Sequence, residues 1–122
     1  MAGPSTAELV IPRRLAVALY AAAQAAPDRV VRGRVLRGRA GLVFVPDGEH
    51  AEDPMFAAFR SQPEGAPSPD RAELELMLSA VPLVLVVSRA TRGVMVLSGH
   101  RRISAGIEAL TVRIQDEDRE AV

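Results

Sequence analysis

Leu83-Val84-Leu85-Val86-Val87 is an unbroken run of aliphatic residues in the second half of the chain. Such a run is typical of a strand that is buried on both faces, because neither face carries a polar residue. Further along, we expect a strand over residues 94–97, a polar break over 99–102 and a short helix or an irregular return over 103–109. Apolar and polar residues then alternate over residues 110–114, which predicts a final strand with one buried face.

The first part of the chain alternates between strand and helix patterns. Residues 10–11 fit a short strand. Residues 13–26 are rich in alanine and have apolar residues at helical spacing, directly after a proline that suits the start of a helix. Residues 30–36 and 42–45 predict a hairpin, because a glycine-rich turn separates them.

The middle of the chain is expected to be a loop that leads into a second helix. Residues 46–67 contain several turn signals, and one apolar turn at Phe56 and Phe59 is expected to pin this loop to the core. Ser68 and Pro69 predict the start of a helix, because serine is a favoured N-cap and proline suits the first helical position. The pattern as a whole predicts an α+β fold, in which a mixed β-sheet is flanked by helices in layers. We expect a flexible N-terminus over residues 1–8, one domain over 9–115 and an acidic C-terminal tail over 116–122.

The composition excludes several classes of function. The chain has 122 residues, and its 15 basic and 15 acidic residues balance, whereas a dedicated nucleic-acid binder usually has a basic excess. Without cysteine it forms neither a disulfide nor a thiolate zinc site, and two histidines are too few for a multi-histidine metal site. We therefore expect no metal and no cofactor. No apolar stretch approaches the ~20 residues of a membrane span and no signal peptide is visible, so we expect a cytoplasmic protein without membrane association.

No catalytic constellation is visible in the sequence. Ser98 precedes His100 by two residues, but the G-x-S-x-G elbow of serine hydrolases is missing. The acids and the histidine at 49–53 are expected to form a solvated loop, and the glycines follow neither dinucleotide-binding nor Walker spacing. No set of residues in the sequence therefore supports the hypothesis of an enzyme with an unrecognised site.

Phe59-Arg60-Ser61-Gln62-Pro63-Glu64-Gly65 is followed closely by Pro67-Ser68-Pro69-Asp70 at the expected helix start. This arrangement resembles the signature of the JAMM/MPN metalloprotease family, in which an H-S-H-P segment is followed by a serine and an aspartate that open a helix. The resemblance runs colinearly over residues 9–114, and it implies the layered, cytidine-deaminase-like architecture of that family. In the family, the two histidines and the aspartate hold zinc, the serine stabilises the oxyanion, and a glutamate from an earlier strand activates the zinc-bound water.

Several groups that this family needs for catalysis are replaced here. Arg60 and Gln62 stand in the place of the two histidines, and an arginine or a valine stands in the place of the glutamate. Ser68 and Asp70 remain, at a shorter spacing than in the family motif. A hydrolytic zinc site needs three ligands, an open position and a base. The resemblance therefore implies a metal-free bacterial pseudoenzyme, whose vestigial site comprises Arg60, Gln62, Ser68 and Asp70.

Inactive members of the family pair with a relative or with each other. The resemblance thus implies a protein-interaction or scaffolding module, with a protein partner or a second copy as its ligand. Five arginines lie between residues 29 and 39, and on a strand Arg32 and Arg34 share one face. We expect Arg32, Arg34 and Arg37 to bind an acidic patch on that partner.

Gly99-His100-Arg101-Arg102 carries a second resemblance, to the G-[EH]-R-R box of ParB-like nucleotide-binding domains. In those domains arginines at a strand-to-helix turn hold phosphates, for which guanidinium groups and helix N-terminal amides are suited. This alternative predicts a phosphate-ligand or nucleic-acid-binding module that uses His100, Arg101 and Arg102.

Overall fold

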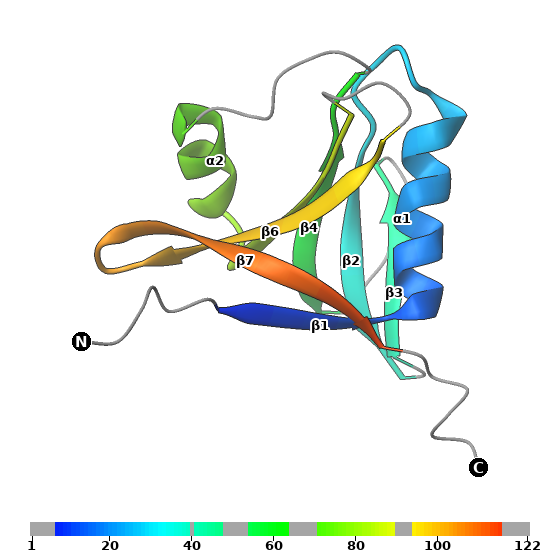
Figure 1. Ribbon diagram of the computed structural model, residues 1–122. Helices are drawn as coiled ribbons and strands as arrows, with labels where there is room; N and C mark the ends of the chain where they lie inside the picture. The colour runs from blue at the N-terminus through cyan, green and yellow to red at the C-terminus, as the bar shows by residue number, and fades with distance from the viewer. Residues whose placement is uncertain (1–6, 40, 48–53, 64–70, 90–93, 116–122) are drawn as a thin grey trace.

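The computed structural model describes residues 7–39, 41–47, 54–63, 71–89 and 94–115. These residues form seven strands and two helices (Figure 1). In chain order the elements are β1 (Glu8–Pro12), α1 (Arg13–Ala25), β2 (Arg32–Gly38), β3 (Gly41–Pro46), β4 (Met55–Ser61), α2 (Arg71–Leu78), β5 (Leu83–Ser88), β6 (Val96–Ile103) and β7 (Gly106–Gln115).

The seven strands form one sheet in the order β1-β7-β6-β5-β4-β2-β3. β1 pairs with β7 and β4 with β5 in parallel, and all other neighbours are antiparallel. The sheet curls into a half-barrel. α1 contacts both edge strands, β1 and β3, as well as β5 and β7. α1 therefore lies on the concave side of the sheet, whereas α2 packs on the opposite side (Figure 1).

The expected α+β architecture, with helices flanking the sheet in JAMM/MPN-like, cytidine-deaminase-like layers, is wrong. Of the described residues, 54% lie in strands and only 23% in helices, and the strands form a single curled half-barrel sheet. The mixture of parallel and antiparallel pairing was expected and is present. The strand content is higher than expected because of two segments, residues 55–61 and 98–109, for which the sequence favoured other conformations.

Phe56 and Phe59 lie in strand β4 and not in a turn within a loop. β4 lies between β2 and β5, and Ala57, Phe59 and Ser61 are buried in strict alternation along it. Alanine has a weak intrinsic preference for strands, so pairing with two neighbouring strands decides the conformation. This tertiary contribution is why the local sequence did not indicate a strand.

The polar residues at 99–102 continue β6 and do not break it. β6 and β7 form a hairpin that pairs from Ser98 and Thr111 to Ile103 and Gly106. Gly106 has a φ of 137°, which glycine adopts far more readily than residues with a side chain. The turn is therefore tight, and the short helix or irregular return expected over residues 103–109 does not form.

β5 confirms the expectation of a strand that is buried on both faces. Leu83, Leu85 and Val87 belong to the main core cluster, which includes the buried side of α1. Val84 and Val86 point the other way and pack in a smaller cluster with α2. The domain thus has a core on each side of one sheet.

α1 follows Pro12 directly and buries an alanine- and leucine-rich face against the concave side. At its C-terminal end, Arg89 Nη1 donates a hydrogen bond to the carbonyl oxygen of Ala23 at 3.0 Å. The same carbonyl also accepts from the Ala26 N–H at 3.3 Å, and the two bonds replace the helical partner that carbonyls in the last turn lack. Of the helices in the described part of the chain, none is long and apolar enough to span a membrane.

Gly33 makes room for an aromatic pair on the concave side. It lies opposite Phe59 in the register between β2 and β4, and the ring of Phe44 lies against its bare Cα. Phe44 therefore reaches Phe59 and meets it edge-on, with ring centroids 5.4 Å apart. This geometry is favourable for aromatic side chains, and it fixes the position of β3 relative to β4.

Candidate functional site

Arg60 and Gln62 lie together at the C-terminal end of β4. Arg60 Nε donates a hydrogen bond to Gln62 Oε1 at 2.8 Å, and Arg60 Nη1 pairs with the carboxylate of Glu73 on α2 at 2.5 Å. The guanidinium therefore links β4 to α2, with only 13% of its side chain exposed. The other two residues predicted at this vestigial site, Ser68 and Asp70, lie outside the described residues.

Ser61, between Arg60 and Gln62, is hydrogen-bonded to the backbone of Val31, just before β2. Its Oγ accepts a hydrogen bond from the Val31 N–H at 3.0 Å, and its own N–H donates to the Val31 carbonyl at 2.9 Å. The side chain is 1% exposed. This serine is therefore a structural group and is not accessible to a substrate.

The three arginines of β2 that were predicted to bind a partner do not share one face. Arg32 and Arg34 lie on the side of the sheet that carries α2, because they alternate with the buried concave residues Gly33 and Val35. Arg37 lies on the concave side, with its guanidinium 4.9 Å from the centre of the Phe56 ring. A cation over an aromatic face is favourable at this distance.

His100, Arg101 and Arg102 do not converge, because they lie in a strand and not at a strand-to-helix turn. Arg101 points to the concave side and pairs with Glu108 on β7, with 2.6 Å between Arg101 Nε and Glu108 Oε1. Arg102 points to the other side, where its Nη2 donates to the backbone carbonyl of Glu75 at 3.3 Å. The two guanidinium groups therefore cannot hold one phosphate together.

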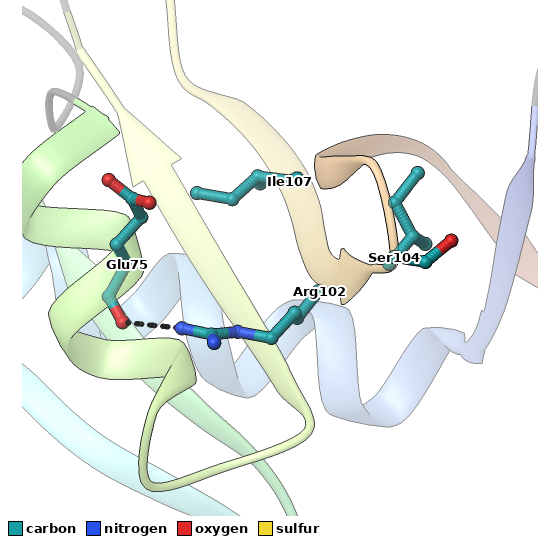
Figure 2. Close-up of a pocket in the computed structure, with 6 residues that line it drawn as sticks. Glu75, Arg102, Ser104 and Ile107 are labelled. Carbon is teal, nitrogen blue, oxygen red and sulfur yellow. Dashed lines mark hydrogen bonds between the residues drawn. The ribbon is translucent and has the colours of Figure 1, made fainter.

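Figure 2 shows the small pocket at the side of Arg102, between α2 and the β6–β7 hairpin. It has a volume of about 170 Å³, and the Arg102 guanidinium lies beside the backbone of Glu75 while Ser104 and Ile107 line the hairpin side. The pocket combines one acidic and one basic side chain and has no second cation among its lining residues. This lining does not form an anion site.

Ser98 and His100 are in contact, with 3.3 Å between Ser98 Oγ and His100 Nε2. They are neighbours on one face of β6, as residues two apart on a strand always are. A catalytic dyad needs a third group that orients the histidine, and no carboxylate in the described residues contacts His100. We therefore assign this pair no catalytic role.

We expect the imidazole of His100 to titrate below 6.5. Partial burial disfavours the charged ring and lowers the pKa of His100 from its ordinary value of 6.5. Between the folded pKa and 6.5 the unfolded chain binds more protons, so this group makes the fold less stable as pH falls through that window and has no effect above it. The chemical shift of the ring protons against pH measures the midpoint, and His100→Gln assigns the signal. A midpoint at or above 6.5 would contradict the placement of His100.

The concave side holds a hollow of about 320 Å³ at the end that α1 leaves uncovered. α1 has 13 residues and is about 20 Å long, whereas the ten residues of β7 span about 33 Å, so the helix cannot cover the whole length of the strands. Six strands contribute to the hollow. Its apolar lining consists of Leu9, Met55, Phe56, Pro82, Leu83 and Leu110.

Two arginines, Arg37 on β2 and Arg101 on β6, complete the lining of this concave hollow. The charge of Arg101 is compensated by Glu108. Arg37 has no carboxylate partner within the described residues, and its guanidinium is held by the Phe56 ring alone. Among the described residues, the concave hollow is therefore an apolar site with one positive charge that no carboxylate compensates.

Sequence reasoning missed the concave hollow because its residues are spread over about a hundred positions and meet only through the strand register. One signal was present. Strand alternation places Arg37 opposite to Arg32 and Arg34, because its number is odd and theirs are even. That parity alone separates Arg37 from the other two arginines.

Comparison with known proteins identifies a fold and no family. The chain matches no family model and no curated protein. It is similar to protein DSY2949 from Desulfitobacterium hafniense, whose structure was determined in solution, with a TM-score of 0.64 and 14% identity over 88% of this chain and 92% of that chain. At this identity the similarity shows a shared fold alone. The resemblances to JAMM/MPN and ParB-like domains are not tested by it and stay predictions.

Proposed function

We propose that this chain is a catalytically inactive protein-binding module whose partner docks in the concave hollow. The observation that carries the proposal is Arg37, which lines an apolar site and pairs with no carboxylate of the described ranges. Such a site matches a protein segment that presents an apolar side chain beside a carboxylate, because the apolar group gives affinity and the charge pair gives orientation. The proposal keeps the interaction function expected from the sequence and moves its centre from Arg32 and Arg34 to Arg37.

The state of the candidate catalytic groups supports inactivity. Arg60 and Gln62, the two described members of the vestigial site, are bonded to each other, and Arg60 also pairs with Glu73. Within the described ranges, no three His, Asp or Glu side chains are close enough together to hold a metal ion. The reaction chemistry of a zinc hydrolase therefore has no support from these residues.

The phosphate-binding alternative has less support. A phosphate site gathers several donors around one anion, whereas Arg101 and Arg102 point to opposite sides of β6 and each already has an acceptor. No contact in the described residues favours this alternative.

A capture experiment with two matched charge reversals tests the proposal. Immobilised wild type, Arg37→Glu and Arg32→Glu are exposed to an extract of the native host. Both positions are exposed arginines of β2, but they lie on opposite faces of the sheet. We expect a protein that wild type and Arg32→Glu retain, and that Arg37→Glu binds at least about 30-fold more weakly, because an opposed carboxylate costs about 2 kcal/mol or more. Retention that is equal in all three or lost equally in both variants would contradict the proposal.

A further inference from the structure

Leu76 is the most exposed large apolar side chain in the described part of the chain, with 75% of it open to solvent. It lies on the outer side of α2, and the side chain of its neighbour Glu75 is 53% exposed. Arg71 approaches Glu75 only to 3.9 Å, and an ion pair between two exposed side chains is weak. α2 thus presents an uncovered leucine beside a carboxylate that is available for pairing.

We infer that the concave hollow binds α2 of a second copy of this chain, with Leu76 entering the hollow and the Glu75 carboxylate pairing with Arg37; this inference rests on the proposed function. The apolar lining of the hollow, including Leu83 and Leu110, is the complement of the leucine side chain. The carboxylate complements the guanidinium of Arg37, which contacts the Phe56 ring and pairs with no carboxylate in the part of the chain that the structure describes.

The side of the hollow that carries Arg101 does not repel the incoming carboxylate. There the carboxylate of Glu108 is bound by Arg101. An incoming Glu75 therefore meets the positive charge of Arg37, and the Glu108 charge is already compensated. Electrostatic complementarity of this kind selects one orientation of the partner.

The geometry makes the contact head-to-tail. The concave hollow lies on the α1 side of the sheet and Leu76 lies on α2, on the opposite side (Figure 1). For the same reason Leu76 cannot reach the hollow of its own chain. One copy presents its hollow and the other its helix, so the contact is heterologous and leaves one free hollow and one free helix for further copies.

Analytical ultracentrifugation up to about 1 mM protein tests the inference, since a contact anchored by one leucine and one ion pair is weak and is populated only at high concentration. We expect wild type to form dimers and larger species as the concentration rises. Leu76→Asp and Arg37→Glu each weaken this association at least about 10-fold, because the first removes an apolar anchor and the second reverses the charge. Val43→Asp, at an exposed position on the edge strand β3, behaves as wild type.

A mixture of the two defective variants distinguishes this contact from any other. Arg37→Glu retains an intact α2, and Leu76→Asp retains an intact hollow. We expect neither to associate alone and an equal mixture to form dimers that do not grow further, because the remaining two surfaces are both disabled. Arg37→Glu combined with Glu75→Arg in one chain is expected to recover association through the reversed ion pair.

Several outcomes would overturn the inference. Wild type that remains a monomer at about 1 mM, association that survives in both variants, or a mixture that stays monomeric would each do so. If Arg37→Glu nevertheless loses a different protein from the host extract, the proposed function stands and only the identity of the partner is wrong. If neither association nor capture depends on Arg37, both fail.

Discussion

Replacing Phe59 with alanine is expected to lower the free energy of unfolding by about 3–5 kcal/mol. Phe59 is fully buried and is the largest buried side chain of the main core. It meets Phe44 edge-on at 5.4 Å, so its loss leaves a cavity and removes the contact that joins β3 to β4. Urea denaturation measures the effect as a lower midpoint at an unchanged slope.

Met55→Ala is the matched control on the same strand. Met55 is 38% exposed and lies at the beginning of β4, so its truncation is expected to cost less than about 1 kcal/mol. Equal effects of the two substitutions would contradict the placement of Phe59 in the core.

Gly33→Ala is expected to destabilise the protein by about 1–3 kcal/mol, the usual cost of an overpacked core. A Cβ at this position would overlap the Phe44 ring and lie 2.8 Å from the carbonyl oxygen of Val45, which is backbone and cannot rotate away. The Phe44 ring must then move, and the contact with Phe59 is lost. Denaturation by urea again measures the loss of stability.

Gly99→Ala controls for the general effect of alanine at a buried strand glycine. Its Cβ would meet Leu110 at 3.4 Å, an ordinary contact distance, so we expect a change of less than about 1 kcal/mol. Gly33→Ala and Phe44→Ala are expected to be partly non-additive, because the double variant has no ring left to displace while the contact with the Val45 carbonyl remains. Additive effects would mean that the ring does not lie against Gly33.

The elements with strong local periodicity were predictable from the sequence. The run at residues 83–87 indicated a strand buried on both faces, and the alanine-rich stretch before Pro27 indicated α1, because burial on one strand or one helix leaves a regular apolar pattern. β4 and the β6–β7 hairpin were not predictable in this way. Their residues include alanines and arginines with weak strand preference, and pairing with neighbours distant in sequence holds them extended.

In the candidate sites, too, contacts between residues close in sequence differ from contacts between distant elements. Arg60 and Gln62 were grouped through the JAMM/MPN resemblance, within a stretch expected to be a loop; they lie in contact because residue 60 belongs to β4 and residue 62 directly follows it. Their partner Glu73 comes from another element, and nothing local indicated it. The concave hollow depends on the register of six strands and on the short length of α1. Such a site follows from the assembled sheet and not from any segment of the sequence.

Methyl NMR on a one-sided complex tests the central claim, that the uncovered end of the concave side is the binding surface. Leu76→Asp with labelled methyl groups supplies an intact hollow, and unlabelled Arg37→Glu supplies an intact α2. The methyl signals of Met55, Leu83 and Leu110 are expected to shift on mixing, while those of Val43 and Val96, exposed elsewhere on the sheet, stay in place. Shifts confined to Val43 or Val96, or no shift in the hollow, would contradict the claim.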